Sequence, residues 1–365
     1  MLETALKLLK EINSHSYKAY IVGGFVRDYL LGIESNDIDI ATNATPKEIK
    51  EIFEDSCLPT EDYGSVTVIM RGIRFEITTF RREKEYINNR KPSEIEYIND
   101  LEEDLRRRDF TINTLCMDEE GKILDYLSSK KDLEEKIIRT VGNAKECFTE
   151  DSLRILRAIR FATILDFTLE EETKTAIKET KSLLKNLSYY RKKEELNKIF
   201  TSTNYKNGIK LLLELELDKE LEIPNLKNVL ATGANSLIGI WTILNIEDKY
   251  PFDKNEMNLI HLVREALEFD NLDPVVLYQY GLYVNSVCAE IKNEDMKSIT
   301  IAYENLRIKN RSEIEISASK ISSILQKKPG KYLKEIYKDI EKEILYRRLE
   351  NKENCISDYI KKNYQ

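Results

Sequence analysis

Histidine is nearly absent from this 365-residue sequence, which contains only His15 and His261. A histidine-based zinc site or a Ser-His-Asp triad needs ligands or partners that two distant histidines cannot supply. The five cysteines are odd in number, scattered and without a CxxC pair, which favours free thiols in a reducing cytoplasm. Any chemistry in this chain must therefore depend on carboxylates and arginines.

Long apolar runs are also missing. No stretch of about 18 apolar residues occurs, so we expect no membrane-spanning helix and no membrane partner. The opening stretch MLETALKLLKEI contains acidic residues and has the pattern of an amphipathic helix, unlike a secretory signal. We therefore expect a cytoplasmic protein.

The chain has no excess of basic residues. Its formal net charge is -8, whereas proteins that bind nucleic acids are usually basic. This charge argues against an RNA partner, but only weakly, because local patches and not the sum determine binding.

The first 150 residues differ in texture from the rest. They hold seven of the twelve glycines and most of the short β-branched runs. After them, long segments with 3.6-residue periodicity follow, such as 151–164, 191–200 and 331–348. The sequence therefore predicts an α+β fold, with a mixed head followed by an all-helical arm. The charged stretch 82–100, interrupted by Pro92, is predicted to be a long mobile loop, which in a compact domain is usually functional or disordered. Expected strands are 18–22, 37–41, 65–70, 73–79, 113–118 and 122–126, and expected head helices are 25–31 and 46–53.

The segment IVGGFVRDYLLG (21–32) predicts a strand, a glycine turn and a helix. Gly23 and Gly24 allow a close approach of the backbone to a ligand, and the helix N-terminus offers N–H groups to a phosphate. Arg27, one turn into the helix, can add a charge-assisted bond to the same phosphate. The structural alternative is a tight turn beside a solvated arginine.

The segment DID supplies two acids, Asp37 and Asp39. On a strand, residues i and i+2 point to the same face, so both carboxylates would converge there. Converging carboxylates repel one another unless a cation lies between them, and Mg²⁺ prefers such oxygen ligands. The alternative is an exposed acidic pair, but the preceding glycine turn favours the metal site.

GGFVRDYLLG followed by DID resembles the opening motif of the class II tRNA nucleotidyltransferase and poly(A) polymerase family. The resemblance covers about the first 200 residues and continues in order through RGIRFEITTFRRE, DLRRRDFTIN, DYLSSKKDL and EDSLRILRAIRFA. It implies a nucleotidyltransferase head with a small mixed sheet (1–140), a helical neck that selects the nucleobase (141–200), a helical body (201–270) and a helical, tRNA-binding tail (271–365).

The resemblance also assigns residues. Asp37 and Asp39 match the catalytic, metal-binding carboxylates, so Mg²⁺ is the expected cofactor, and Glu76 is a candidate third ligand. In the family, the segment RRRDFTIN contacts the ribose and phosphates of the incoming nucleotide. Arg108 suits the triphosphate, while Asp109 and Asn113 suit ribose hydroxyls.

The acidic and basic residues of EDSLRILRAIRFA resemble the protein template of the family. Asp151 can only accept and Arg154 can only donate hydrogen bonds, which complements cytosine and adenine but not uracil or guanine. Arg157 and Arg160 are expected to support the phosphates or this pair. An amphipathic helix with salt bridges is the structural alternative. Arg191 and Glu195 match polar positions of the next helical motif, whereas Ser128-Ser129 stands where the family often has a Gly-Gly hinge.

The resemblance predicts a tRNA nucleotidyltransferase that adds the 3'-terminal CCA from CTP and ATP and releases pyrophosphate by a two-metal mechanism. The alternatives are A-only or CC-only addition, poly(A) tailing, transfer to a small molecule, and an inactive RNA-binding protein. The full-length 82–100 segment argues against CC-only addition, and the intact DID argues against lost catalysis. In the tail, basic clusters alternate with Tyr332, Tyr337, Tyr346 and Tyr359, which could contact tRNA. A solvated helical face is the structural alternative there.

Overall fold

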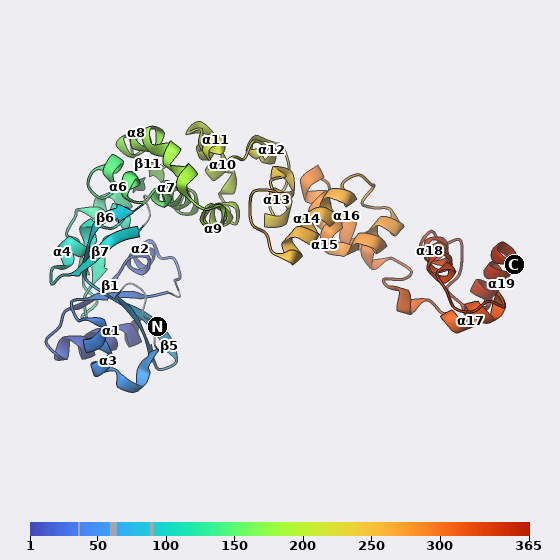
Figure 1. The fold of residues 1–365 in the computed structure, drawn as a ribbon, viewed down its shortest axis with the longest axis horizontal. Coiled ribbons are helices and arrows are strands. Elements are labelled where there is room, and N and C mark those ends of the chain that lie inside the picture. The colour runs from blue at the N-terminus through green and yellow to red at the C-terminus, as the bar shows by residue number, and fades with distance from the viewer. Residues whose placement is uncertain (36, 59–63, 88–90) are drawn as a thin grey trace. The chain divides into compact units, whose positions relative to one another are not determined.

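A computed structural model describes residues 1–35, 37–58, 64–87 and 91–365 (Figure 1). The chain forms two compact units, Met1–Ile223 and Pro224–Gln365. The four-part division expected from the sequence stays a prediction. Within the described ranges, every helix is too short or too polar to cross a membrane.

A seven-stranded sheet forms the centre of the first unit. The parallel pair is β2–β5 and the other neighbouring pairs are antiparallel, which confirms the predicted small mixed sheet. In spatial order the strands are β3 (Cys57–Leu58), β4 (Ser65–Met70), β5 (Ile73–Thr79), β2 (Asp39–Thr42), β1 (Ala19–Val22), β8 (Cys116–Met117) and β9 (Ile123–Leu124).

The two faces of this sheet differ because side chains alternate along each strand. On β5, Phe75 and Ile77 are buried, whereas Glu76 and Thr78 between and beyond them face away from that core. The helices α1 (Leu2–Ser14) and α3 (Pro46–Ile52) pack against strands β1 and β4. One face of the sheet therefore packs into the core, and the other face is polar.

Helices make up most of the remainder of the first unit. The helical prediction after residue 150 is confirmed, although a two-stranded parallel sheet joins β10 (Ile137–Ile138) to β11 (Thr168–Leu169). The helices are α2 (Gly24–Leu31), η1 (Glu54–Ser56), α4 (Leu101–Arg106), η2 (Thr111–Asn113), α5 (Ser129–Glu134), α6 (Ala144–Glu150), α7 (Leu153–Leu165), α8 (Glu171–Thr180), η3 (Lys181–Asn186), α9 (Tyr189–Phe200), α10 (Tyr205–Glu214) and α11 (Leu217–Glu220).

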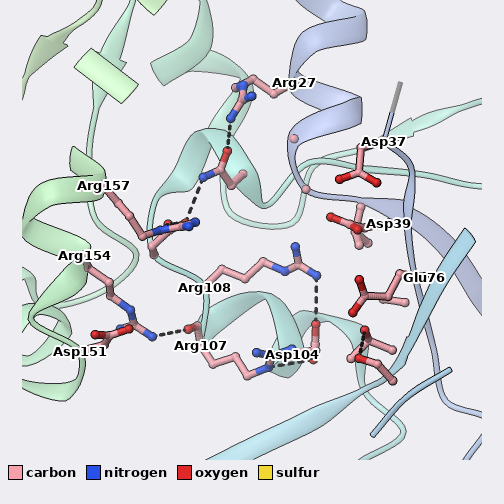
Figure 2. A pocket seen from close by; sticks show the side chains of 18 of the residues that line it. Arg27, Asp37, Asp39, Glu76, Asp104, Arg107, Arg108, Asp151, Arg154 and Arg157 are labelled. Atoms are coloured by element: carbon pink, nitrogen blue, oxygen red, sulfur yellow. Dashed lines mark hydrogen bonds and ion pairs between the residues drawn. The ribbon is translucent and has the colours of Figure 1, made fainter. Parts of the chain in front are cut away.

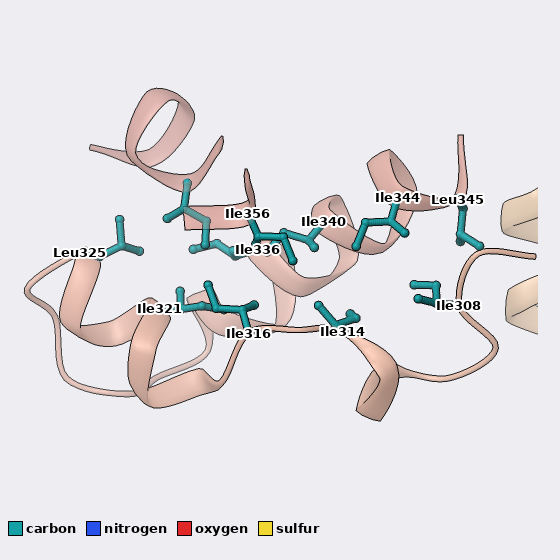
Figure 3. Close-up of a cluster of buried hydrophobic side chains, with 11 residues drawn as sticks. Ile308, Ile314, Ile316, Ile321, Leu325, Ile336, Ile340, Ile344, Leu345 and Ile356 are labelled. Carbon is teal, nitrogen blue, oxygen red and sulfur yellow. The ribbon is translucent and has the colours of Figure 1, made fainter. Parts of the chain in front are cut away.

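The second unit is helical, with an isoleucine-rich core near its C-terminal end (Figure 3). Amphipathic spacing explains this core, because Ile336, Ile340 and Ile344 recur every four residues on α18. Its helices are α12 (Leu226–Leu230), α13 (Leu237–Leu244), α14 (Lys254–Ala266), α15 (Pro274–Lys292), α16 (Met296–Glu304), η4 (Arg311–Glu313), α17 (Ala318–Ile324), α18 (Tyr332–Leu345) and α19 (Glu353–Tyr364).

The tail tyrosines make internal hydrogen bonds. Tyr359 donates to Asp339 at 2.7 Å and Tyr346 donates to Asp273 at 2.8 Å. The hydroxyls of Tyr332 and Tyr337 donate to backbone carbonyls at 3.2 and 3.1 Å. These hydroxyls therefore have structural roles within the second unit, and stacking of the tyrosine rings on RNA stays a prediction.

The loop predicted for residues 82–100 is wrong. The structure forms an antiparallel hairpin of β6 (Arg81–Ile87) and β7 (Lys91–Tyr97), and residues 88–90 lie outside the described ranges. The backbone ladder holds this hairpin without apolar alternation, and Arg82 pairs with Glu96 at 3.4 Å in its register. The polar composition of this stretch therefore led to the wrong prediction of a loop where two strands form.

Four predicted element bounds also need correction. The strand expected over residues 122–126 is limited to β9, because its ladder with β8 pairs only two residues. The strand with Asp39 begins at that residue and not at Asp37, because its partner β1 ends where Gly23 turns away with φ of 75°. Asn113 lies in the short helix η2, where Thr114 bonds back to the carbonyl of Thr111 at 2.8 Å, and not on a strand. The helix expected from residue 151 is interrupted at its start, as described below.

Candidate active site

One cavity of about 710 Å³ lies on the polar side of the sheet, against α4, α7 and α9. This volume falls within the range of small-molecule sites, about 300–1,000 Å³. In Figure 2, Asp37, Asp39 and Glu76 lie on one side of the cavity, and Asp151, Arg154 and Arg157 lie on the opposite side. All thirteen residues singled out in the sequence line it: Gly23, Gly24, Arg27, Asp37, Asp39, Glu76, Arg108, Asp109, Asn113, Asp151, Arg154, Arg157 and Arg160.

Three carboxylates converge at the sheet. Asp39 on β2 is the direct register partner of Glu76 on β5, so both side chains leave the same face. Asp37 precedes the strand and also lines the cavity. Burial, followed by the negative charges of Asp37 and Glu76, raises the pKa of Asp39 to about 6, while Arg108 acts in the opposite direction. The protein thus concentrates negative charge here without fully neutralising it.

The chemistry of this donor set fits divalent cations. Carboxylate oxygens are the ligands that hard cations prefer, and a cation would remove the repulsion that raises the pKa of Asp39. In the part of the chain that the structure describes, no three His, Cys, Asp or Glu side chains already have the mutual spacing of a metal site. The carboxylate oxygens of Asp37, Asp39 and Glu76 would hold such an ion.

Gly23 brings the backbone close to both Asp39 and Arg108. A Cβ atom at this position would lie 3.4 Å from Nη1 of Arg108 and 3.6 Å from Oδ2 of Asp39, and its φ of +75° disfavours other residues. The Nε atom of Arg108 is buried and has no hydrogen-bond partner among the described residues, while its Nη2 is 3.5 Å from Asp104. Arg108 therefore has an unmet donor beside the glycine turn.

Buried hydrogen bonds link α2 to α7 across the nucleotide segment. Nη1 of Arg27 donates to Oδ1 of Asn113 at 2.7 Å, and Nδ2 of Asn113 donates to Asp109 at 3.0 Å. Nε of Arg157 donates to the other oxygen of Asp109 at 2.6 Å. Burial alone would raise the pKa of Asp109, but Arg157 and the bonds from Asn113 and Phe110 more than offset it and lower that pKa. Arg27, predicted as a phosphate ligand, here holds Asn113.

Removing Arg157 should destabilise the protein. Asp109 is 8% exposed, so Arg157→Met would leave a buried carboxylate without its main counter-charge, at a cost of about 3 kcal/mol. Thermal or urea unfolding measures this loss. Adding Asp109→Asn to this variant removes the unpaired negative charge and should recover part of the lost free energy of unfolding. Equal stability of wild type and Arg157→Met would contradict the ion-pair assignment.

Asp151 lies at a junction between two helices and not within one. Helix α6 ends at Glu150, Asp151 is extended, and α7 begins at Leu153, whose N–H donates to Oδ1 of Asp151 at 3.0 Å. Burial raises the pKa of Asp151, against the hydrogen bond from Leu153 and the charge of Arg191, whose Nη2 is 3.7 Å away. The bond from the N–H of Leu153 therefore fixes the direction of the Asp151 side chain.

Arg154 is engaged by the protein. Its Nη1 donates to Glu150 at 2.8 Å and to the carbonyl of Cys147 at 3.2 Å, and its Nη2 donates to the carbonyl of Arg107 at 2.9 Å. These partners tie the helix junction to the head. They hold the guanidinium of Arg154 in a fixed position in the cavity wall.

Three arginines surround the ring of Phe161 in the cavity wall. The guanidinium carbons of Arg160, Arg27 and Arg157 lie 4.4, 5.0 and 5.5 Å from the ring centroid. Arg160 also donates to Glu195 of α9 at 3.0 Å. Burial and the charge of Arg157 oppose protonation and lower the pKa of Arg160, while Glu195 acts against them.

Several cavity residues escaped the sequence analysis as site residues. Asp104 is almost fully buried and accepts from Arg107 at 2.9 Å, and its position one turn before Arg108 could have revealed it. Phe161, Ser65 and Thr78 are uncharged, so no sequence pattern assigned them to the site. Arg191 was identified as a polar match only, yet its side chain lines the cavity. Its Nη1 is buried, and no residue in the described part of the chain bonds to it.

The comparison with known proteins establishes the family. The CCA-adding enzyme of Ligilactobacillus salivarius is 36% identical to this chain over 386 residues, which cover 98% of this chain and 96% of that protein. The CCA-adding enzyme of Bacillus subtilis is 33% identical and covers 98% of this chain and 97% of its own. The chain belongs to the CCA-adding enzyme family. It is therefore an enzyme, a nucleotidyltransferase, and the resemblance seen in the sequence is confirmed.

Family models and solved structures agree with this assignment. The Poly A polymerase head domain matches residues 19–139, and a tRNA nucleotidyltransferase domain model matches residues 243–360. A crystal structure of the Bacillus stearothermophilus CCA-adding enzyme in complex with CTP superposes with a TM-score of 0.87 at 27% identity, covering 99% of this chain and 96% of that one. The Thermotoga maritima enzyme complexed with tRNA shares the fold at a TM-score of 0.72 and 22% identity, covering 100% and 95%.

Proposed function

We propose that this protein completes or repairs the 3'-terminal CCA of tRNA from CTP and ATP. The observation that carries the proposal is the single cavity in which Asp37, Asp39 and Glu76 face Asp151 and Arg154. The relatives from Ligilactobacillus salivarius and Bacillus subtilis are CCA-adding enzymes, and the solved Bacillus stearothermophilus relative is in complex with CTP. The net charge of -8 argued against an RNA partner, but eight arginines line the cavity. Positive charge is therefore concentrated where the nucleotide would bind.

Asp37, Asp39 and Glu76 would hold Mg²⁺ in this proposal. When bound, two such ions would lower the pKa of the attacking hydroxyl and neutralise the departing pyrophosphate. Gly23, Gly24 and Arg108 would bind the triphosphate, for which the unmet Nε donor of Arg108 is the best support.

Base choice would rest on Asp151 with Arg154. The carboxylate of Asp151 accepts from the exocyclic amino group of cytosine or adenine, whereas uracil and guanine present a carbonyl there. Arg154, which Glu150 and two backbone carbonyls hold in place, would donate to the base from this fixed position. Arg157, through Asp109 and Asn113, would hold the nucleotide segment in place.

The direct test uses tRNA that lacks all three terminal nucleotides. With CTP alone we expect two additions, with ATP alone no addition, and with both nucleotides three additions and then arrest. A tRNA ending in CC should receive one A. Addition of A alone would replace the proposal by A-only addition, C without A by CC-only addition, and continued A addition by poly(A) tailing.

The β6–β7 hairpin offers a second prediction. It extends from the head beside Arg81, a cavity residue, so its shortening is expected to impair the A step more than the two C steps. Separate single-turnover rates for tRNA ending in C and in CC measure this difference. Equal losses in both steps would show that the hairpin does not control the change from C to A.

We also propose that the enzyme acts in the cytoplasm on the acceptor arm of tRNA. The five cysteines are free thiols, as in a reducing compartment. The second unit, which includes the region matched by the tRNA nucleotidyltransferase domain model, would contribute the additional tRNA contacts.

A further inference from the structure

The polar sheet face continues beyond the carboxylates onto β4. In the antiparallel β4–β5 register, Thr67 lies opposite Glu76 and Ser65 lies opposite Thr78. Because Glu76 and Thr78 are two residues apart on β5, their side chains share a face, and Ser65 shares it from β4. Ser65 and Thr78 also line the same cavity as Asp39 and Glu76.

The two hydroxyls form a pair with remaining hydrogen-bonding capacity. Oγ of Ser65 and Oγ1 of Thr78 are 3.0 Å apart, and both residues are half-buried. Each hydroxyl has one donor and two acceptor sites, so one mutual bond leaves one O–H and several lone pairs. No further partner of either hydroxyl occurs among the residues that the structure describes. This neutral donor-and-acceptor pair suits a sugar hydroxyl better than a phosphate or a nucleobase.

The order of the groups across the sheet gives the direction of attack. From one side to the other lie the Gly23 turn after β1, Asp39 on β2, Glu76 on β5, and Ser65 on β4. In nucleotidyl transfer the attacking and leaving oxygens lie roughly in line through the phosphorus atom. If pyrophosphate leaves beside Gly23 and Arg108, the attacking hydroxyl must approach from the side of β5 and β4.

We propose that Ser65 and Thr78 bind the ribose of the 3'-terminal nucleotide of the acceptor RNA. This inference rests on the proposed function and names a subsite within it. In the step concerned, the terminal 3'-oxygen bonds to the α-phosphorus of the nucleotide, and its proton passes to solvent. The bond from that phosphorus to the β-bridging oxygen breaks, and pyrophosphate leaves with the electron pair. The hydroxyl pair contacts the neighbouring 2'-hydroxyl and so orients the attacking oxygen.

The test compares two acceptors and three proteins. The acceptors are tRNAs without CCA whose last nucleotide carries either ribose or 2'-deoxyribose, each with an intact 3'-hydroxyl. The proteins are the wild type, the double variant Ser65→Ala/Thr78→Val, and Thr175→Val as a control. Thr175 is exposed on α8, and its hydroxyl donates to the carbonyl of Glu171 in the same helix at 2.9 Å. The measured quantity is kcat/KM for the addition of the first C, together with the KM for CTP.

The wild type and Thr175→Val are expected to prefer the ribose-ended acceptor about five- to tenfold, the worth of one hydrogen bond. In the double variant this preference should fall below about twofold, with the KM for CTP unchanged. The conservative pair Ser65→Thr/Thr78→Ser keeps a hydroxyl at each position and should keep the preference for the ribose-ended acceptor.

Two results would overturn the subsite. One is an equal preference for ribose in the wild type and the double variant. The other is a loss of discrimination between CTP and dCTP in the double variant, which would assign the pair to the incoming nucleotide. Failure of the wild type to add C to either acceptor would instead refute the proposed function, so the two failures can be told apart.

Discussion

Asp39→Asn is expected to lower the incorporation of C and of A alike by about a thousandfold. The substitution keeps the shape of the side chain but removes the charge that lies in register with Glu76. Loss of several kcal/mol of charge stabilisation in the transition state corresponds to a factor of this size. Both nucleotides should suffer equally because they would share one set of carboxylates. Single-turnover incorporation on tRNA ending without CCA and on tRNA ending in CC measures the two effects.

The matched control is Glu51→Gln, which neutralises an exposed acid on α3 away from the cavity. It should leave both rates unchanged. Binding of tRNA by Asp39→Asn, measured by gel retardation, should remain close to the wild-type value, because the substitution affects the nucleotidyl-transfer step and not tRNA binding. Retained incorporation of either nucleotide would refute the assignment of Asp39.

Asp151→Ala is expected to relax base choice more than it slows the reaction. A mispaired buried polar group costs about 1–3 kcal/mol, so removing the carboxylate should reduce discrimination against UTP and GTP by about ten- to hundredfold. Asp151→Asn should admit UTP more readily than Asp151→Ala, because an amide N–H can donate to the uracil carbonyl. Competition between CTP and UTP on one tRNA measures both variants.

Glu146→Ala provides the control for this experiment. Glu146 is exposed on α6, close in sequence to the junction but outside the cavity residues. It should retain the wild-type preference. If Asp151→Ala kept full discrimination while its rate fell, Asp151 would act only by holding the start of α7 through the N–H of Leu153.

Alternation and turn chemistry made part of the fold predictable. The strands β4 and β5 have the bounds expected from the sequence, because apolar side chains alternate on both sides of the Arg71-Gly72 turn. The hairpin β6–β7 was missed because its strands are almost entirely polar. The break at Asp151 was missed because the 3.6-residue period runs on through it, and only the local bond to Leu153 marks the boundary.

The residues of the candidate site could be predicted from the sequence, but their hydrogen-bond partners could not. Short motifs named the acids and arginines, and the fold brings all of them into one cavity. The partners of Arg27 and Arg157 lie 86 and 48 residues away in the chain, and no motif spacing reports such pairs. The Ser128-Ser129 turn is a similar case. Ser128 is left-handed, and the hydroxyl of Ser129 bonds to Thr114 at 2.6 Å, a contact that a Gly-Gly turn could not make.

The central claim is that Asp37, Asp39 and Glu76 hold divalent cations where a nucleoside triphosphate binds. Titration of the protein with Mn²⁺, followed by electron paramagnetic resonance with and without CTP, tests it independently of turnover. We expect tight Mn²⁺ binding that strengthens with CTP in the wild type and is lost in Asp39→Asn. Equal Mn²⁺ binding by the two proteins in the presence of CTP would contradict the claim.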